Sequence, residues 1–214
     1  MRNVIIADDH PVVFRGLREI LRENFGGVVV EGAGTGRELI EKVKRNDYDL
    51  VLLDICLPDA NGLDILSDLR RKRPKLPVLV ISMYPEELYA VRAIRTGAQG
   101  YLTKQSAPEE LVTAVRKILS GKRYVNPAFA VRMVVDFESD IAKPAHERLS
   151  NREFQVMHMF GSGKSIRDIA DELNLSINSI RTYRARIMDK IGVKGTQGLI
   201  HYALTHGLIE YRSE

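Results

Sequence analysis

Residues 50–62 read Leu-Val-Leu-Leu-Asp-Ile-Cys-Leu-Pro-Asp-Ala-Asn-Gly. Four apolar residues, Leu50–Leu53, precede a single carboxylate, Asp54, and a loop with proline and glycine follows. A short apolar run without alternation is typical of a strand that is buried on both faces of a parallel sheet. In such sheets, ligands bind beyond the carboxyl ends of the strands. Asp54 is therefore predicted to lie at the ligand-binding edge of a sheet.

Four similar apolar runs flank this segment, and stretches with helical periodicity separate them. The expected strands are Val4–Ala7, Val28–Glu31, Leu50–Leu53, Val78–Ile81 and Gly100–Leu102. The expected helices are Val12–Glu23, Gly36–Arg45, Gly62–Arg73, Glu86–Thr96 and Pro108–Ser120. Strand–helix alternation of this kind implies right-handed crossovers. We therefore predict a doubly wound, five-stranded parallel α/β sheet over residues 1–121.

The residues that directly follow the predicted strands are chemically related. They are Asp8, Asp9, Asp54, Ser82 and Lys104. Three carboxylates at one edge repel one another and have raised pKa values unless a cation holds them. A hard divalent ion with oxygen ligands, Mg²⁺ above all, removes that cost. Because Ser82 and Lys104 add a hydroxyl donor and a positive charge, the set contains the parts of a phosphoryl-transfer site.

Each of these residues also has a purely structural interpretation. Asp8 or Asp9 can cap the helix that follows, Ser82 can serve as a cap or turn residue, and Lys104 can be a solvated surface charge. The coincidence of all five at strand ends favours a functional site. His10 lies beside the acidic pair, but one histidine without a second nitrogen or sulfur ligand is a weak metal signal.

The strand–helix rhythm stops after residue 121. Residues 122–146 are predicted to be a linker, with helical spacing over Ala128–Phe137 and a polar stretch after it. Residues 147–214 then form a small all-α domain whose second and third helices make a helix-turn-helix. Its four helices are expected at 151–161, Ile166–Leu173, Ile177–Ile191 and Thr196–His206.

The third of these helices is strongly basic. The chain has a formal net charge of +4, but the local distribution says more. Between Ser176 and Lys194 only Asp189 is acidic, whereas the basic residues are Arg181, Arg184, Arg186, Lys190 and Lys194. Such a surface suits phosphates, and a basic second helix of this motif belongs in the major groove of DNA. The alternative is an amphipathic helix with a solvated basic face.

The motifs of the first half resemble a response-regulator receiver domain, which has a flavodoxin-like fold. The resemblance rests on Asp8-Asp9, Asp54-x-x-Leu57-Pro58-x-x-Asn61-Gly62, Ser82 and Tyr101-x-x-Lys104. It implies that Asp54 takes a phosphoryl group from a phosphohistidine on a partner sensor kinase. It also implies that Lys104 contacts the phosphoryl oxygens and that Ser82 and Tyr101 act as the switch. An ordinary strand aromatic is the alternative for Tyr101.

The same resemblance implies a set of Mg²⁺ ligands. Asp9 and Asp54 would bind the ion directly, Asp8 would bind it through water, and the backbone carbonyl of Cys56 would complete the protein ligands. The thiol of Cys56 has no such role, because nothing basic immediately flanks it to lower its pKa.

The second half resembles the LuxR-type helix-turn-helix, and the whole chain resembles a NarL/FixJ-type response regulator. The motif is Leu149-Ser150-x-Arg152-Glu153, Gly163-x-Ser165-x-x-Asp168-Ile169-Ala170 and Leu175-Ser176-x-x-Ser179-Ile180-x-Thr182-Tyr183. Base contacts are implied for Arg181, Thr182 and Ala185, and phosphate contacts for Asn178, Arg184, Arg186 and Lys190. A homodimer on DNA is implied, with a dimerisation helix that carries Leu199, Ile200, Ala203 and Leu204. Half of this apolar set must pack on its own domain.

These observations favour a transcription regulator over an enzyme. A Mg²⁺-dependent aspartyl-phosphate phosphatase or transferase would need a DxD motif after the first strand and a cap-sized insertion, and neither is found. A receiver that serves only as a phosphorylation-independent interaction module is the other alternative.

The sequence also bears on the compartment. Cys56 is the only cysteine, so an internal disulfide is excluded and a reducing cytosol fits. The first apolar run is too short for a signal peptide, and the longest charge-free stretch, Leu76–Pro85, falls short of the ~20 residues that a membrane span needs. We expect a cytoplasmic protein that does not interact with membranes.

Overall fold

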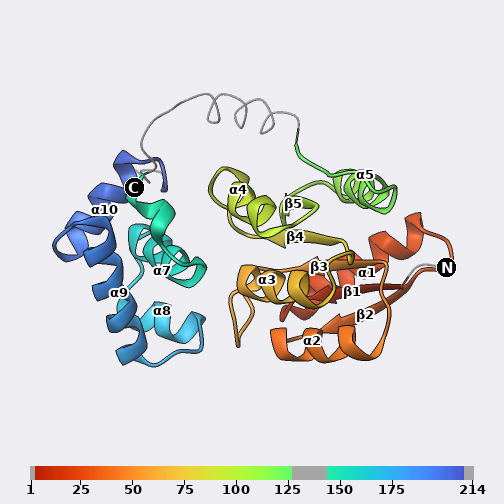
Figure 1. Ribbon diagram of the computed structural model, residues 1–214, viewed down its shortest axis with the longest axis horizontal. Helices are drawn as coiled ribbons and strands as arrows, with labels where there is room; N and C mark the ends of the chain where they lie inside the picture. The colour runs from red at the N-terminus through yellow and green to blue at the C-terminus, as the bar shows by residue number, and fades with distance from the viewer. Residues whose placement is uncertain (1–2, 127–143, 210–214) are drawn as a thin grey trace. The chain divides into compact units, whose positions relative to one another are not determined.

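The structure, a computed structural model, describes residues 3–126 and 144–209. The chain divides into two compact units, residues 1–139 and 140–214 (Figure 1). The segment Ala128–Phe137, for which the sequence predicts helical spacing, lies outside the described residues. Within the described ranges, no helix has the length and apolar character to cross a membrane.

The first unit is a five-stranded parallel sheet with the strand order β2-β1-β3-β4-β5. The strands are β1 Asn3–Ala7, β2 Val29–Ala33, β3 Leu50–Leu53, β4 Val78–Ser82 and β5 Gly100–Thr103. The helices are α1 Pro11–Asn24, α2 Gly36–Arg45, α3 Gly62–Lys72, α4 Glu86–Thr96 and α5 Pro108–Leu119. The predicted doubly wound α/β fold is confirmed.

Helices cover both faces of this sheet (Figure 1). Alternate strand residues, such as Ile6, Leu52 and Ile81, join one core cluster with the inner faces of α1 and α5. The other face carries α2, α3 and α4. Because every residue of β3 and β4 is buried, these strands read as continuous apolar runs. The sheet thus holds its central strand ends rigidly at one edge.

The second strand differs from its predicted bounds. The sequence predicts Val28–Glu31, whereas β2 runs from Val29 to Ala33 and pairs along its whole length with β1. The glycine at position 32 suggests a strand end, but it has a packing role. A Cβ atom there would lie 2.9 Å from the ring of Phe14 in α1, so only glycine lets the helix approach the strand.

The second unit is helical, as predicted. It contains the 3₁₀ helix η1 Ala145–Arg148 and the α-helices α7 Asn151–Gly161, α8 Ile166–Glu172, α9 Ile177–Ile191 and α10 Gly195–Thr205. Capping boxes start α7 at Ser150 and α8 at Ser165. Between α8 and α9, Asn174 adopts a left-handed backbone with φ 50°, a conformation that asparagine tolerates. The short turn that results sets α8 and α9 as a helix-turn-helix.

Candidate functional site

Four side chains gather where β1 and β3 end. Ligand atoms of Asp8, Asp9, His10 and Asp54 all lie within 4.8 Å of one another. Lys104, which follows β5, joins them, because its Nζ lies 2.7 Å from Asp8 Oδ2 and 2.7 Å from Asp54 Oδ2. The parallel sheet therefore brings the predicted acids and the predicted amine together from three strands.

Burial controls the charge of this cluster. It raises the pKa of Asp54 to about 6, against the opposing effect of the Lys104 ammonium, while the charge of Asp8 raises it further. Burial also disfavours the charge on Lys104, but the two carboxylates outweigh this effect and its pKa is raised. Asp54 is thus still ionised at neutral pH, in a site where its charge is costly.

The donor set suits a hard cation. Asp54 Oδ1 is buried and has no hydrogen-bond partner among the described residues, so one lone-pair face of this carboxylate is available. Asp9 and His10 are partly exposed beside it, and His10 Nδ1 lies 2.8 Å from Asp9 Oδ1. Carboxylate oxygens are the ligands that Mg²⁺ prefers, and of the residues described Lys104 is the one ammonium that balances Asp8 and Asp54. The residues present therefore fit the expected ion.

The structural alternatives account for only some of these positions. The N-cap of α1 is His10, without a side-chain cap bond, and Asp8 instead accepts the His10 N–H at 2.9 Å. The N-cap of α4 is Pro85, so Ser82 does not cap that helix. Lys104 is a buried ion-pair partner, with 5% of its side chain exposed. Ser82 does have the turn role that the sequence left open, because its Oγ accepts the Tyr84 N–H two residues on, whereas Asp8 caps no helix and Lys104 is not a solvated charge.

Ser82 and Tyr101 lie in the interior beside the cluster. Ser82 is fully buried and its Oγ accepts the Tyr84 N–H at 3.3 Å. Tyr101 is 1% exposed, and its hydroxyl donates to the Tyr84 carbonyl at 2.8 Å. The ring of Tyr84 in turn stacks on that of Tyr89 in α4, with centroids 4.5 Å apart. The backbone of Tyr84 therefore connects the predicted switch pair to α4.

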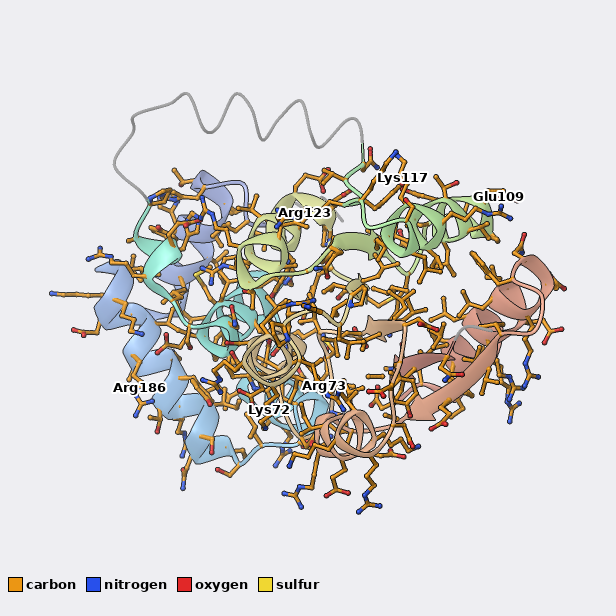
Figure 2. All side chains as sticks on the ribbon, turned by 45° about the vertical axis from the view of Figure 1, so that its right-hand side comes forward. Lys72, Arg73, Glu109, Lys117, Arg123 and Arg186 are labelled. Carbon is orange, nitrogen blue, oxygen red and sulfur yellow. The ribbon has the colours of Figure 1, made fainter. Side chains whose placement is uncertain are left out.

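The second unit presents the predicted recognition helix. On α9, Ile180 and Ile187 are buried, whereas Arg181 and Arg186 are exposed, and Figure 2 labels Arg186 on this helix. Asn178, Thr182 and Ala185 are also exposed. A cationic surface of this kind on the second helix of a helix-turn-helix is suited to the major groove.

Sequence comparison identifies the family of each unit. The profile of the response regulator receiver domain matches residues 4–116, and that of the luxR family of bacterial regulatory proteins matches residues 147–203. The chain is 33% identical to the response regulator UvrY of Escherichia coli (strain K12), over 97% of this chain and 96% of UvrY. The chain belongs to the NarL/FixJ-type response regulators.

Other relatives of this response regulator span its full length. Response regulator GacA of Pseudomonas aeruginosa is 31% identical over 100% of both chains. A structure of RcsB from Salmonella enterica serovar Typhimurium, bound to promoter rprA with the phosphomimetic BeF₃⁻, superposes with a TM-score of 0.63 at 28% identity. It covers 94% of this chain and 98% of RcsB. The similarity to these relatives therefore extends over both the receiver and the helix-turn-helix.

Lys190 of this response regulator has a structural contact that the sequence did not predict. Its Nζ lies 2.6 Å from Oε2 of Glu153, a buried carboxylate of the capping box of α7. Burial raises the pKa of Glu153, but the bonds from Lys190 and Ser150 outweigh this and lower it. Lys190 thus anchors α9 on α7. The side chain of Lys190 remains partly exposed, so its predicted phosphate contact stays a prediction beside this structural role.

The predicted dimerisation helix packs half of its apolar set on its own domain. Leu199 and Ala203 are that half, because both are 0% exposed within their own unit. Ile200 and Leu204 are half-buried on the same helix and keep an accessible surface. Arg184 is likewise half-buried, which makes it less accessible than Arg181 or Arg186.

Two further residues shape the phosphoacceptor loop, Asp59, for which no role was predicted, and Gly62 of the receiver motif. Asp59 accepts the backbone N–H groups of Gly36 at 2.8 Å and Arg37 at 2.9 Å, and so caps α2 from a distant loop. Gly62 donates its N–H to the Ile55 carbonyl at 2.8 Å, and a Cβ atom there would lie 2.0 Å from Asp54 O. The Pro-x-x-Asn-Gly pattern is the signal that could have pointed to Gly62.

Proposed function

We propose that Mg²⁺-dependent transfer of a phosphoryl group from a sensor histidine kinase to Asp54 controls promoter binding through α9. The observation that carries this proposal is the ionised, buried carboxylate of Asp54. One of its oxygens is held by Lys104, and the other has no hydrogen-bond partner in the described chain. A desolvated carboxylate with a directed counter-charge is suited to act as a nucleophile.

The residues present carry out the transfer as follows. A carboxylate oxygen of Asp54 attacks the phosphorus, a new O–P bond forms, the P–N bond to the kinase histidine breaks, and the electron pair stays on the imidazole. Lys104 balances the charge that the phosphoryl oxygens bring. When bound, Mg²⁺ supplies the remaining positive charge. Asp8, Asp9, Asp54 and the carbonyl of Cys56 would hold it.

The phosphoryl group then changes hydrogen bonding in the interior. We infer that the Ser82 hydroxyl moves to the phosphoryl oxygens, which weakens its contact with the Tyr84 N–H. Because the Tyr101 hydroxyl also holds Tyr84, the backbone that leads into α4 changes with it. The surface that responds is the α4–β5–α5 face, residues 86–120. We also infer that the receiver catalyses its own phosphorylation and dephosphorylation.

The proposal also covers the domain boundaries, the dimer on DNA and the location of the protein in the cell. Residues 1–121 are the receiver, 122–146 the linker and 147–214 the DNA-binding domain. A homodimer on DNA would read two half-sites, since one helix-turn-helix covers little sequence. In it, Ile200 and Leu204 would offer apolar surface to the second chain. A cytoplasmic location agrees with the single thiol, Cys56.

Asp54→Asn tests the phosphoacceptor. We expect acetyl phosphate with Mg²⁺ to add one phosphoryl group to the wild-type chain, as seen by intact mass, and none to the variant. Asp47→Asn, in an exposed carboxylate of the same unit, should be labelled normally. Labelling that survives Asp54→Asn would refute the proposal. Sustained turnover of p-nitrophenyl phosphate would favour the enzyme alternative instead.

Arg181→Ala tests how α9 reads DNA. Because an arginine that is bidentate to guanine contributes about 1–3 kcal/mol of discrimination, we expect this variant to lose preference for the operator over a scrambled duplex. Arg186→Ala should weaken both duplexes alike. The comparison needs an operator, which genome-wide footprinting of wild type beside Asp54→Asn supplies. Equal losses in the two variants would contradict the assignment. Lys190 is unsuitable for this test because it holds Glu153.

A further inference from the structure

The edge of the sheet opposite to Asp54 carries positive charge that phosphoryl transfer does not use. Helices α2, α3 and α5 run back from the phosphoacceptor edge, so their last turns end at this opposite edge. Six basic side chains there are exposed and pair with no carboxylate in the described part of the chain. They are Lys44, Arg45, Lys72, Lys75, Lys122 and Arg123. We call this set the basic edge.

Hydrogen bonds make the basic edge continuous between α2 and α3. Arg73 donates to Asp47 Oδ1 at 3.0 Å and to the Val43 carbonyl at 3.1 Å, which joins the ends of the two helices. Lys44 and Arg45 lie at the end of α2, and Lys72 ends α3. Figure 2 labels Lys72 and Arg73 at the end of α3.

The basic edge continues from α3 to the segment that leaves the receiver. Gln99 accepts from Arg70 Nη2 at 2.8 Å through its side chain, and from the Tyr124 N–H at 2.8 Å through its carbonyl. Burial lowers the pKa of Arg70, and the charge of Arg123 lowers it further. Like charges are therefore held close together across this edge, which is unfavourable unless an anion balances them.

Helix dipoles explain only part of this charge. A basic residue in the last turn of a helix gains about 0.3–1 kcal/mol, and the effect fades beyond that turn. Lys75, Lys122 and Arg123 lie past the ends of α3 and α5. The nearby carboxylates of Asp47 and Asp49 are engaged by Arg73 and by the Asn3 N–H. A surplus of exposed cations remains.

The tether makes DNA the partner that fits. From Asn126, where the described receiver ends, to Pro144, where the described residues resume, the chain advances by 18 residues. At no more than about 3.5 Å per residue these span at most about 60 Å, or nearly two turns of duplex at about 34 Å each. Phosphates beside a bound α9 are therefore within reach of the receiver. Because both surfaces belong to one chain, the second contact is intramolecular, and even weak ionic contacts count.

We propose that the basic edge binds the phosphate backbone of duplex DNA that flanks the site of α9. The inference rests on the proposed DNA binding by α9 and adds a second, sequence-independent contact to it. It assigns the receiver a direct share in affinity, besides its role as the phosphorylated switch.

The test uses the full chain with Lys72→Glu and Lys75→Glu combined. The matched control combines Arg15→Glu and Arg37→Glu, which changes the net charge equally at exposed receiver positions away from this edge. Binding to random-sequence duplexes of 16 and 40 base pairs is followed by fluorescence anisotropy over a range of salt. We expect the edge variant to lower the slope of log K against log salt by about 2 on the longer duplex, and to leave the shorter one unchanged.

Each outcome decides the matter. Equal changes in the edge and control variants, or an unchanged slope on the longer duplex, would overturn the inference. The same titration with single-stranded RNA of equal length is a further check. If the edge variant lost affinity for this RNA but not for the duplex, the inference would also be overturned. If instead the proposed DNA binding by α9 were wrong, a different result would follow. Arg181→Ala combined with Arg186→Ala would then leave binding to the 16-base-pair duplex intact. Circular dichroism of each variant checks that the receiver is folded.

Discussion

Replacing Gly62 by alanine is expected to destabilise the receiver by about 3 kcal/mol or more, the upper range for overpacking a buried position. The new methyl group would lie 2.0 Å from the Asp54 carbonyl oxygen and 2.8 Å from Ile55 Cα. Both are backbone atoms, so no side chain can turn away to make room. The loop that carries Asp54 must shift, and we therefore expect weaker Mg²⁺ binding as well.

Differential scanning calorimetry of the full chain measures this effect. The receiver transition is identified as the one that Mg²⁺ shifts upward. Gly16→Ala is the matched control, since Gly16 lies within α1 and a Cβ there meets nothing within 4 Å. That substitution should stabilise the receiver by about 0.5–1 kcal/mol, the usual gain in a helix. A Gly62→Ala transition at the wild-type temperature would contradict the steric argument.

The sequence predicted the fold well because the parallel sheet encodes it locally. Each central strand is buried on both faces, so it appears as an unbroken apolar run, and the polar residue after it marks the edge. Asp54, Ser82 and Lys104 could be placed in this way without any coordinates. Gly32 shows the limit, because a packing glycine under Phe14 cannot be told from a turn glycine by composition.

Long-range polar contacts escaped prediction for a similar reason. Lys190 looks like any other basic residue of α9, and only the structure shows the buried Glu153, 37 positions away, that holds it. Asp59 caps α2 across 22 positions, whereas capping patterns in a sequence are local. Periodicity marks Leu199 as apolar but does not say whether its own domain or a second chain covers it.

The two ends of the receiver therefore have opposite electrostatic characters. At the phosphoacceptor edge, burial concentrates carboxylates around one lysine, so that an added cation is favourable. At the opposite edge, exposed cations surround the exit toward the second unit, so that an added polyanion is favourable. The two proposals thus assign the phosphoryl group and the DNA backbone to different residues of one small domain.

Replacing Lys104 by methionine is expected to destabilise the receiver by about 3–5 kcal/mol at pH 8 without Mg²⁺, as when one partner of a buried ion pair is removed. Asp8 and Asp54 would then be buried side by side without a counter-charge. Without Lys104 the pKa of Asp54 rises above its value of about 6. A carboxyl with a raised pKa loses native-state stability as pH rises through that pKa, so the deficit grows above pH 6 and shrinks below it.

Urea unfolding at several pH values, followed by circular dichroism, measures this dependence. Lys44→Met, at an exposed position without an ion-pair partner in the described structure, should have little effect at any pH. Adding Asp54→Asn to Lys104→Met should recover much of the loss, because the second substitution removes the charge that Lys104 balances. Adding Mg²⁺ to the Lys104→Met variant should also recover part of the lost stability. A deficit that stays the same from pH 5 to pH 8 would show that Lys104 contributes packing rather than charge balance.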